Sequence, residues 1–207
     1  MNVQQEVIKE FGGYIQKHTT NIQRIRNNVG KIKDSYSKLS GMIAAKIIKT
    51  EIDKVIACND LPYKTTEYNV YINSCFTEWD LLIVKKEASI QDDLAIYELK
   101  DVLAVVECKA YGLFFTSKDN TYNPLRNFLA SYKMLKEKNE NLRSIYITIS
   151  EQFPKRHSSI SYIDLTRKAM FEGTGRLDNI FCFSKNREIP YLDNGYEWEE
   201  FIINVLK

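Results

Sequence analysis

Residues 104–112, with the sequence AVVECKAYG, place an acid and a base at the end of an apolar run. Glu107 and Lys109 are two positions apart, so on a β-strand their side chains point to the same face of the sheet. The five residues before Glu107 are all apolar, as is typical of a strand that is covered on both faces. The sequence therefore predicts a carboxylate and an ammonium group side by side on a buried strand.

A second acid stands next to another apolar run. Asp80 directly precedes residues 81–84 in the stretch FTEWDLLIVKK, and Asp80 and Glu107 would meet if the two strands are neighbours in one sheet. Two carboxylate ligands with open water positions suit Mg²⁺. A lysine beside them can orient or help to deprotonate a water and offset the charge of a phosphate. These residue types favour phosphodiester hydrolysis in which a metal polarises the phosphoryl oxygen and lowers the pKa of water.

A competing motif has the same spacing. The triplet Glu98-Leu99-Lys100 lies nearer to Asp80 in the sequence than Glu107 does. The polar residues 91–93 that precede it are typical of an exposed turn rather than of a buried strand. We therefore prefer Glu107 as the partner of Asp80.

Glu51 is a candidate third acid. It falls at the margin of the apolar stripe of a helix predicted over residues 42–58. A carboxylate buried there without a partner would be costly. Glu51 either pairs with Lys54 or Lys49 at the surface or faces a site.

The elements that must position these residues follow a recognisable order. Helices are predicted over residues 42–58 and 123–139, and strands over 64–72, 76–86, 101–111 and 143–150. The order helix, three strands, helix, strand predicts a mixed sheet flanked by helices. Weaker patterns further on predict a basic loop over 155–157, a helix over 162–171, a strand over 179–184 and a terminal helix after residue 195.

The first forty residues have a heptad pattern of their own. The apolar seam consists of Ile8, Phe11, Ile15, His18, Ile22, Ile25, Val29, Ile32, Tyr36 and Leu39. Gly12 and Gly13 weaken the first turn, so the helix is predicted to begin near Tyr14, and Ser40-Gly41 is predicted to end it. The stripe either packs on the protein's own core or forms a dimeric coiled coil.

Composition and charge narrow the class of protein. The chain of 207 residues has 44% hydrophobic and 27% charged residues and a net charge of +2, of which residues 1–40 contribute +4. Four cysteines lie far apart without a CxxC pair, which favours free thiols over a zinc site. No apolar run reaches membrane length. These features predict a cytoplasmic protein that does not bind membranes.

The chain resembles the PD-(D/E)XK nucleases, the restriction-endonuclease-like superfamily. The likeness covers roughly residues 40–150 and rests on Asp80 in EWDLLIV, on Glu107 and Lys109 in VLAVVECKA, and on the order of the elements. The stretch SGMIAAKIIKTE followed by LP also resembles poorly characterised bacterial members of this group. The resemblance implies an α/β fold with a restriction-endonuclease-like core, in which an α-β-β-β-α-β unit forms a mixed sheet flanked by helices.

The resemblance also implies roles for individual residues. Asp80 and Glu107 would bind Mg²⁺, or Mn²⁺ in its place, through their carboxylates, with the main-chain carbonyl of Cys108 as a further ligand. Lys109 would position the attacking water. An acid on the first core helix often joins the metal site of such enzymes, which would make Glu51 a catalytic residue.

The expected domain organisation and function follow from these points. A helical segment over residues 1–40 is expected to precede a nuclease-like domain over 41–207, which would hydrolyse phosphodiester bonds as a DNA endonuclease of a restriction or defence type. A homodimer through the N-terminal helix would place two active sites against two strands. An RNA-cleaving nuclease or toxin, or a catalytically silent nucleic-acid-binding or interaction protein on the same fold, remain alternatives.

Some features depart from the family pattern. Trp79 rather than proline precedes Asp80, and the long gap to Glu107 predicts an inserted hairpin or loop over residues 85–100. The stretch NFLASY lacks the QxxxY motif of the RecB-like exonuclease branch. Neither Trp79 nor the long gap removes a predicted ligand.

Overall fold

The computed structural model describes residues 3–26, 33–91, 93–111, 124–150, 179–183 and 197–207. Its helices are α1 (Val3–Arg26), α2 (Lys33–Cys58), α3 (Pro124–Lys136) and α5 (Trp198–Leu206), with a 3₁₀ turn η1 (Leu99–Asp101). Its strands are β1 (Tyr63–Thr65), β2 (Val70–Ile72), β3 (Cys75–Trp79), β4 (Leu81–Lys85), β5 (Ile96–Tyr97), β6 (Val102–Tyr111), β7 (Arg143–Ser150) and β8 (Asn179–Cys182). The basic loop predicted over 155–157 and the helix predicted over 162–171 lie outside the described residues.

A five-stranded mixed sheet in the order β1-β4-β6-β7-β8 forms the centre of the fold. The pairs β1–β4 and β4–β6 are antiparallel, whereas β6–β7 and β7–β8 are parallel. Two parallel neighbours need a crossover connection, and α3 lies between β6 and β7 in the chain. From α2 to β7, the elements of this sheet and its helices therefore follow the order helix, three strands, helix, strand. The predicted mixed sheet flanked by helices is confirmed at this level.

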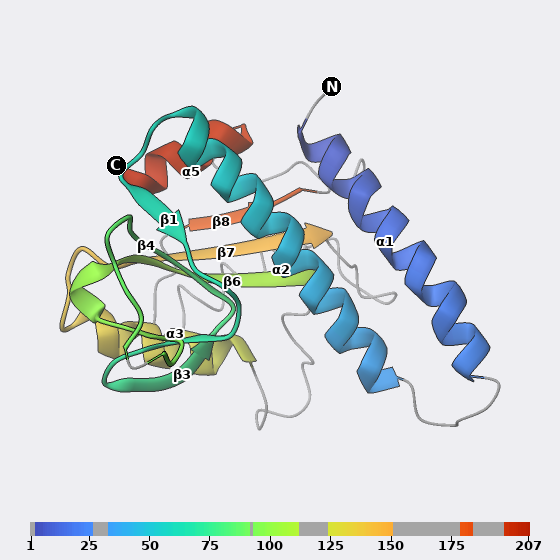
Figure 1. Cartoon of the computed structure of the whole chain (residues 1–207), viewed down its shortest axis with the longest axis horizontal. Coiled ribbons are helices and arrows are strands. Elements are labelled where there is room, and N and C mark those ends of the chain that lie inside the picture. Colours follow the sequence, from blue (N-terminus) through green and yellow to red (C-terminus); the bar gives the residue numbers. More distant parts are fainter. Residues whose placement is uncertain (1–2, 27–32, 92, 112–123, 151–178, 184–196) are drawn as a thin grey trace, which may run out of the picture.

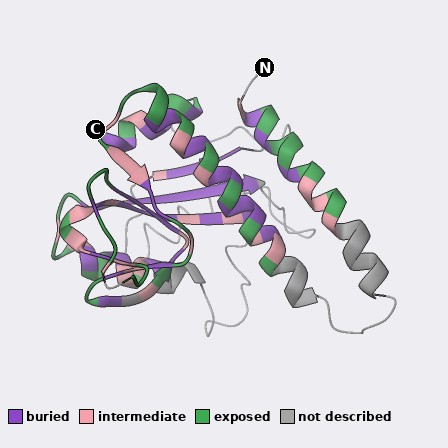
Figure 2. Cartoon of the chain, viewed as in Figure 1, coloured by how far each residue is buried: buried purple, intermediate pink, exposed green. Residues whose placement is uncertain are grey.

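Helices cover the central sheet on both faces (Figure 1). α2 crosses one face with α1 beside it, and these two helices and α5 share one apolar core with alternate residues of the sheet, including Leu81 and Val106. The opposite residues, such as Leu82 and Val105, share a second core with Trp79 and with side chains of α3. Figure 2 shows the central strands as mostly buried, as expected for a sheet between two layers.

The structure also has a second, three-stranded sheet in the order β3-β2-β5. Because of it, two strand predictions were wrong. The stretch predicted over 64–72 is divided between β1 in the central sheet and β2 in the small one, and the stretch over 76–86 is divided at Asp80 into β3 and β4. The chain leaves the central sheet before Asn69, whose φ of 57° is a left-handed conformation that asparagine tolerates. Alternation of residue types cannot reveal that a strand changes sheets, because each half keeps an apolar pattern.

The segment over 85–100 contains a short bridged turn, Gln91 with Leu94, and the strand β5, which pairs parallel with β2. The predicted insertion is thus folded against the small sheet. Its position leaves the β4–β6 pairing of the central sheet intact, apart from an irregularity between Ile83 and Val84.

The N-terminal prediction was wrong in its boundaries. α1 begins at Val3 rather than near Tyr14, and α2 runs through Ser40-Gly41 without a break. Glycine in a helix costs about 1 kcal/mol relative to alanine, but burial of Val7 and Phe11 in the first core offsets this cost in α1. The predicted boundary between residues 40 and 41 therefore falls inside a helix.

Several described positions of the heptad stripe, Phe11, Ile15 and Leu39, pack on the protein's own core. Phe11 is buried and Ile15 is partly buried against the same cluster, whereas Ile8 is 38% exposed. At Phe11 and Ile15 this favours packing on the protein's own core over a dimeric coiled coil. Among the described residues, no helix combines the length and the apolar character needed to cross a membrane.

Candidate active site

Asp80 lies at the point where the chain passes from the small sheet to the central sheet. Trp79 before it and Leu81 after it are fully buried, and the N–H of Asn69 donates to the Asp80 carbonyl at 3.4 Å. The Asp80 side chain itself is 32% exposed. The residues on both sides of Asp80 are thus buried, while its carboxylate keeps contact with solvent.

The Asp80 carboxylate reaches across to β6. The N–H of Cys108 donates to Asp80 Oδ2 at 2.7 Å, just beyond the last register pair of the two strands, Leu81 with Val106. In a strand, the N–H and C=O of one residue point toward the same neighbour. The Cys108 carbonyl therefore faces the side on which Asp80 lies. This orientation is the one it would need to serve as a metal ligand together with Asp80.

Lys109 joins the two acids. Its Nζ forms an ion pair with Glu107 Oε1 and lies 3.8 Å from Asp80 Oδ2. The Glu107 side chain is 13% exposed and that of Lys109 27% exposed. The structure thus brings together Asp80, Glu107, Cys108 and Lys109.

The electrostatics of this group differ from those of a surface ion pair. Burial is the main cause that raises the pKa of Glu107 to about 7; Lys109 opposes this shift, and the nearby Asp80 adds to it. Burial lowers the pKa of Lys109, but the charges of Glu107 and Asp80 outweigh this effect and raise it overall. Lys109 is therefore a stable cation, while Glu107 changes its charge near neutral pH.

Tyr146 is a neighbour that the sequence analysis missed. It pairs in register with Glu107 on the parallel strand β7, and burial, followed by the charges of Glu107 and Asp80, raises its pKa well above its ordinary value. Its phenol therefore stays neutral beside the acids. Only the register of β6 and β7, which the sequence does not encode locally, could have revealed this proximity.

Glu51 has a different environment. It is buried on α2 and accepts a hydrogen bond from Lys54 Nζ at 2.6 Å, and this contact is the main reason for the raised pKa of Lys54. Glu10 and Glu6 of α1 contribute to the same shift, so this pair faces α1. Among the described residues, no hydrogen bond or ion pair joins Glu51 to Asp80, Glu107 or Lys109. Its predicted pairing with Lys54 is present, and its catalytic role stays a prediction.

The competing triplet serves the inserted segment instead. The Glu98 carboxylate accepts hydrogen bonds from the side-chain amides of Asn73, at 3.0 Å, and Gln91. Lys100 is exposed in η1. The side chain of Glu98 thus ties the turn at residue 91 to the small sheet rather than pairing with Asp80.

The donor set fits a magnesium ion. No group of three or more His, Cys, Asp or Glu side chains in the described part of the chain is arranged to hold a metal. Mg²⁺, however, is commonly bound by one or two carboxylates and keeps several waters. Asp80 and Glu107 supply two carboxylates, and the Cys108 carbonyl faces the side on which Asp80 lies. A divalent cation would favour the ionised form of Glu107, which burial and the nearby Asp80 oppose.

Comparison with known proteins adds no assignment. Neither a protein-family model nor a curated protein nor a solved structure matches the chain.

Proposed function

We propose that the chain is a Mg²⁺-dependent nuclease with a restriction-endonuclease-like core, and that its substrate is DNA. The observation that carries this proposal is the junction of β4 and β6. There Asp80 accepts from the Cys108 N–H, and Lys109 contacts Glu107 and approaches Asp80. The order of the elements around the central sheet supports the same proposal.

Each residue of the junction has a task in this proposal. Asp80 and Glu107, with the Cys108 carbonyl, would hold the metal, which when bound acts as a Lewis acid on the phosphoryl oxygen and on water. Lys109 stays protonated beside the carboxylates, so its ammonium group can orient a water and offset charge on a phosphate. Glu107 must be ionised to bind a cation, which its pKa of about 7 permits at neutral and higher pH.

The setting of the reaction is part of the proposal. All four cysteines are free thiols, which suits a reducing compartment such as the cytoplasm. DNA is preferred to RNA because of the likeness to restriction enzymes, although the same metal site serves either substrate. A homodimer through the N-terminal helix, which would place two sites against two strands, stays a prediction.

A cleavage assay tests this proposal. The purified protein is incubated with supercoiled plasmid, single-stranded DNA and RNA, each with Mg²⁺, Mn²⁺ or EDTA. The Lys109→Ala variant is expected to lose cleavage, because the ammonium group next to both carboxylates is gone. The matched control is Lys100→Ala in the Glu98-Leu99-Lys100 triplet, which should cut like the wild-type protein.

The substrates separate the alternatives. Cleavage of RNA alone would favour an RNA-cutting enzyme with the same site. Binding of nucleic acid without cleavage in any metal would favour a catalytically silent binding protein and would refute the proposed activity.

A further inference from the structure

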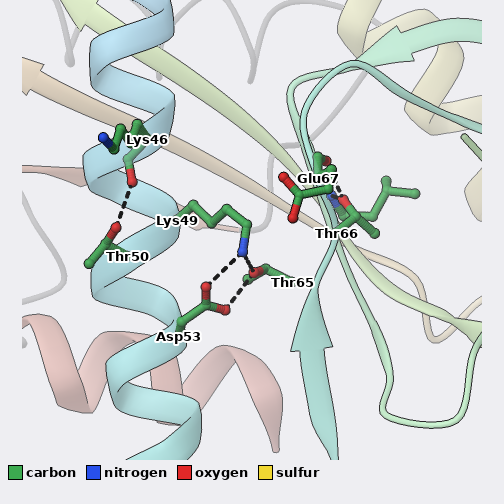
Figure 3. Close-up of polar contacts among 8 residues, drawn as sticks. Lys46, Lys49, Thr50, Asp53, Thr65, Thr66 and Glu67 are labelled. Carbon is green, nitrogen blue, oxygen red and sulfur yellow. Dashed lines mark hydrogen bonds and ion pairs between the residues drawn. The ribbon is translucent and has the colours of Figure 1, made fainter.

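A closed polar cluster joins α2 to β1, the strand next to β4 (Figure 3). Lys49 Nζ donates to Asp53 Oδ2 and to Thr65 Oγ1, each at 2.8 Å, and the Thr65 hydroxyl donates to Asp53 Oδ1. Thr65 is buried, and the Lys49 side chain is only 17% exposed. We call these three residues the α2–β1 clasp.

The clasp is continuous with the backbone around Asp80. Thr66 exchanges two hydrogen bonds with Leu82: its N–H donates to the Leu82 carbonyl at 3.0 Å, and its Oγ1 accepts from the Leu82 N–H at 2.9 Å. Asn69, further along the same segment, donates to the Asp80 carbonyl. Residues 65–69 therefore run along residues 80–82 and hold the backbone at Asp80 and two residues beyond it.

Residues 65–69 need an anchor at β1, the strand from which they continue. β1 has three residues and, among the strands that the structure describes, pairs with β4 alone, so it is a short edge strand whose ladder contributes little by itself. The Asp80 side chain is partly exposed, so packing alone does not set its position. Its contact with the Cys108 N–H at 2.7 Å depends on where the backbone places it.

We propose that Lys49, Asp53 and Thr65 are positioning residues for Asp80. The clasp anchors the end of β1 on α2, the Thr66–Leu82 pair transmits this anchor to β4, and the Asp80 carboxylate is thereby held against β6. The consequence for metal binding rests on the proposed function. The positioning itself concerns contacts within the chain only.

The direct readout is the backbone amide of Cys108. Its proton is donated to the Asp80 carboxylate, so its NMR chemical shift reports whether that contact exists, and Asp80→Ala supplies the reference for its loss. Thr65→Val removes the clasp hydroxyl with little change in shape. Thr65→Ser restores the hydroxyl, and Lys49→Met is a second clasp variant should Thr65→Val fail to fold.

The control uses another ion pair on β4. Lys85 Nζ pairs with Asp101 Oδ1 at 3.2 Å at the end of β4 remote from Asp80. Lys85→Met removes an ion pair of a more exposed lysine, 46% against 17% for Lys49, at that end of β4 and without touching the clasp. Urea unfolding of every variant measures its loss of stability, so a displaced Cys108 amide can be separated from general destabilisation.

The proposal predicts that in Thr65→Val and Lys49→Met the Cys108 amide shifts toward its Asp80→Ala position, while Thr65→Ser and Lys85→Met keep the wild-type shift. Mg²⁺ binding measured by calorimetry should weaken about tenfold in the first two variants only. An unmoved Cys108 amide in the clasp variants would overturn the inference. Failure of the wild-type protein to bind Mg²⁺ would refute the proposed function, and the amide shift would still decide the role of the clasp.

Discussion

At the scale of single residues, Glu107 is the group whose charge the fold opposes. Burial and Asp80 raise its pKa from an ordinary 4.5 to about 7, although Lys109 pulls in the other direction. Between these two pH values the unfolded chain has released the proton and the folded chain still holds it. The unfolded state then binds fewer protons, so folding stability falls as pH rises through this window and stays lowered above it.

Glu107→Gln should remove this penalty, because glutamine resembles the protonated acid. The variant is expected to gain stability over the wild-type protein at pH 8, on the order of 3 kcal/mol, with no gain at pH 4. Urea unfolding at both pH values measures this. A gain that is the same at both values would show that the ionised carboxylate is not the cause.

Lys109 acts as the internal counter-ion of the two acids. With the ammonium group removed, the carboxylates of Asp80 and Glu107 would face each other uncompensated, and a divalent cation should replace it. Lys109→Met is therefore expected to bind Mg²⁺ about tenfold more tightly, which corresponds to about 1.4 kcal/mol, while failing to cleave. Calorimetry with Lys100→Met as the control checks this, and weaker binding in Lys109→Met would contradict it.

At the scale of elements, the sequence predicts strand β6 well and the strands around Asp80 less well. The apolar run before Glu107 suffices to identify a buried strand, because no turn residue interrupts it. The segment over 76–86 also contains an apolar run, residues 81–84, but the change of sheet at Asp80 depends on tertiary contacts with Asn69 and Cys108. Asp80 therefore lies between two strands, β3 and β4, rather than inside one strand. At this position its side chain can reach the Cys108 N–H of β6.

The packing of the N-terminal helix α1 is a second feature that the sequence alone does not determine. Its heptads left open whether the stripe packs inside the chain or between chains, because apolar residues at these spacings suit either arrangement. The buried Phe11 and the exposed Ile8 differ only in the neighbours that α2 and the sheet provide. No local pattern separates them.

Phe11→Ala should therefore destabilise the fold by about 3 kcal/mol, because it leaves a cavity in the first core. Ile8→Ala, at a position that is 38% exposed, should cost less than about 1 kcal/mol. Chemical unfolding of both variants tests this. Equal losses at the two positions would contradict an intrachain role for Phe11, as would a loss that varies with protein concentration.

At the scale of the whole molecule, the central sheet brings together residues that are distant in the sequence. Asp80 and Cys108 are 28 positions apart and are joined by a direct hydrogen bond. The sequence analysis expected Asp80 to meet the end of β6 only on the condition that the two strands are neighbours, and the pairing of β4 with β6 meets that condition. The small sheet, the clasp and the placement of Glu51 toward α1 were not predictable, because each depends on which element packs on which rather than on any run of residues.

The most direct test of the central claim is plasmid cleavage by Asp80→Asn. Asparagine keeps the shape and an acceptor for the Cys108 N–H but removes the charge that would hold Mg²⁺. The matched control is Asp101→Asn, which removes the carboxylate that pairs with Lys85 on the far end of β4. The account predicts Mg²⁺-dependent cleavage by the wild-type protein and by Asp101→Asn, and loss of cleavage in Asp80→Asn. Equal cleavage by all three proteins, or cleavage that persists in EDTA, would contradict it.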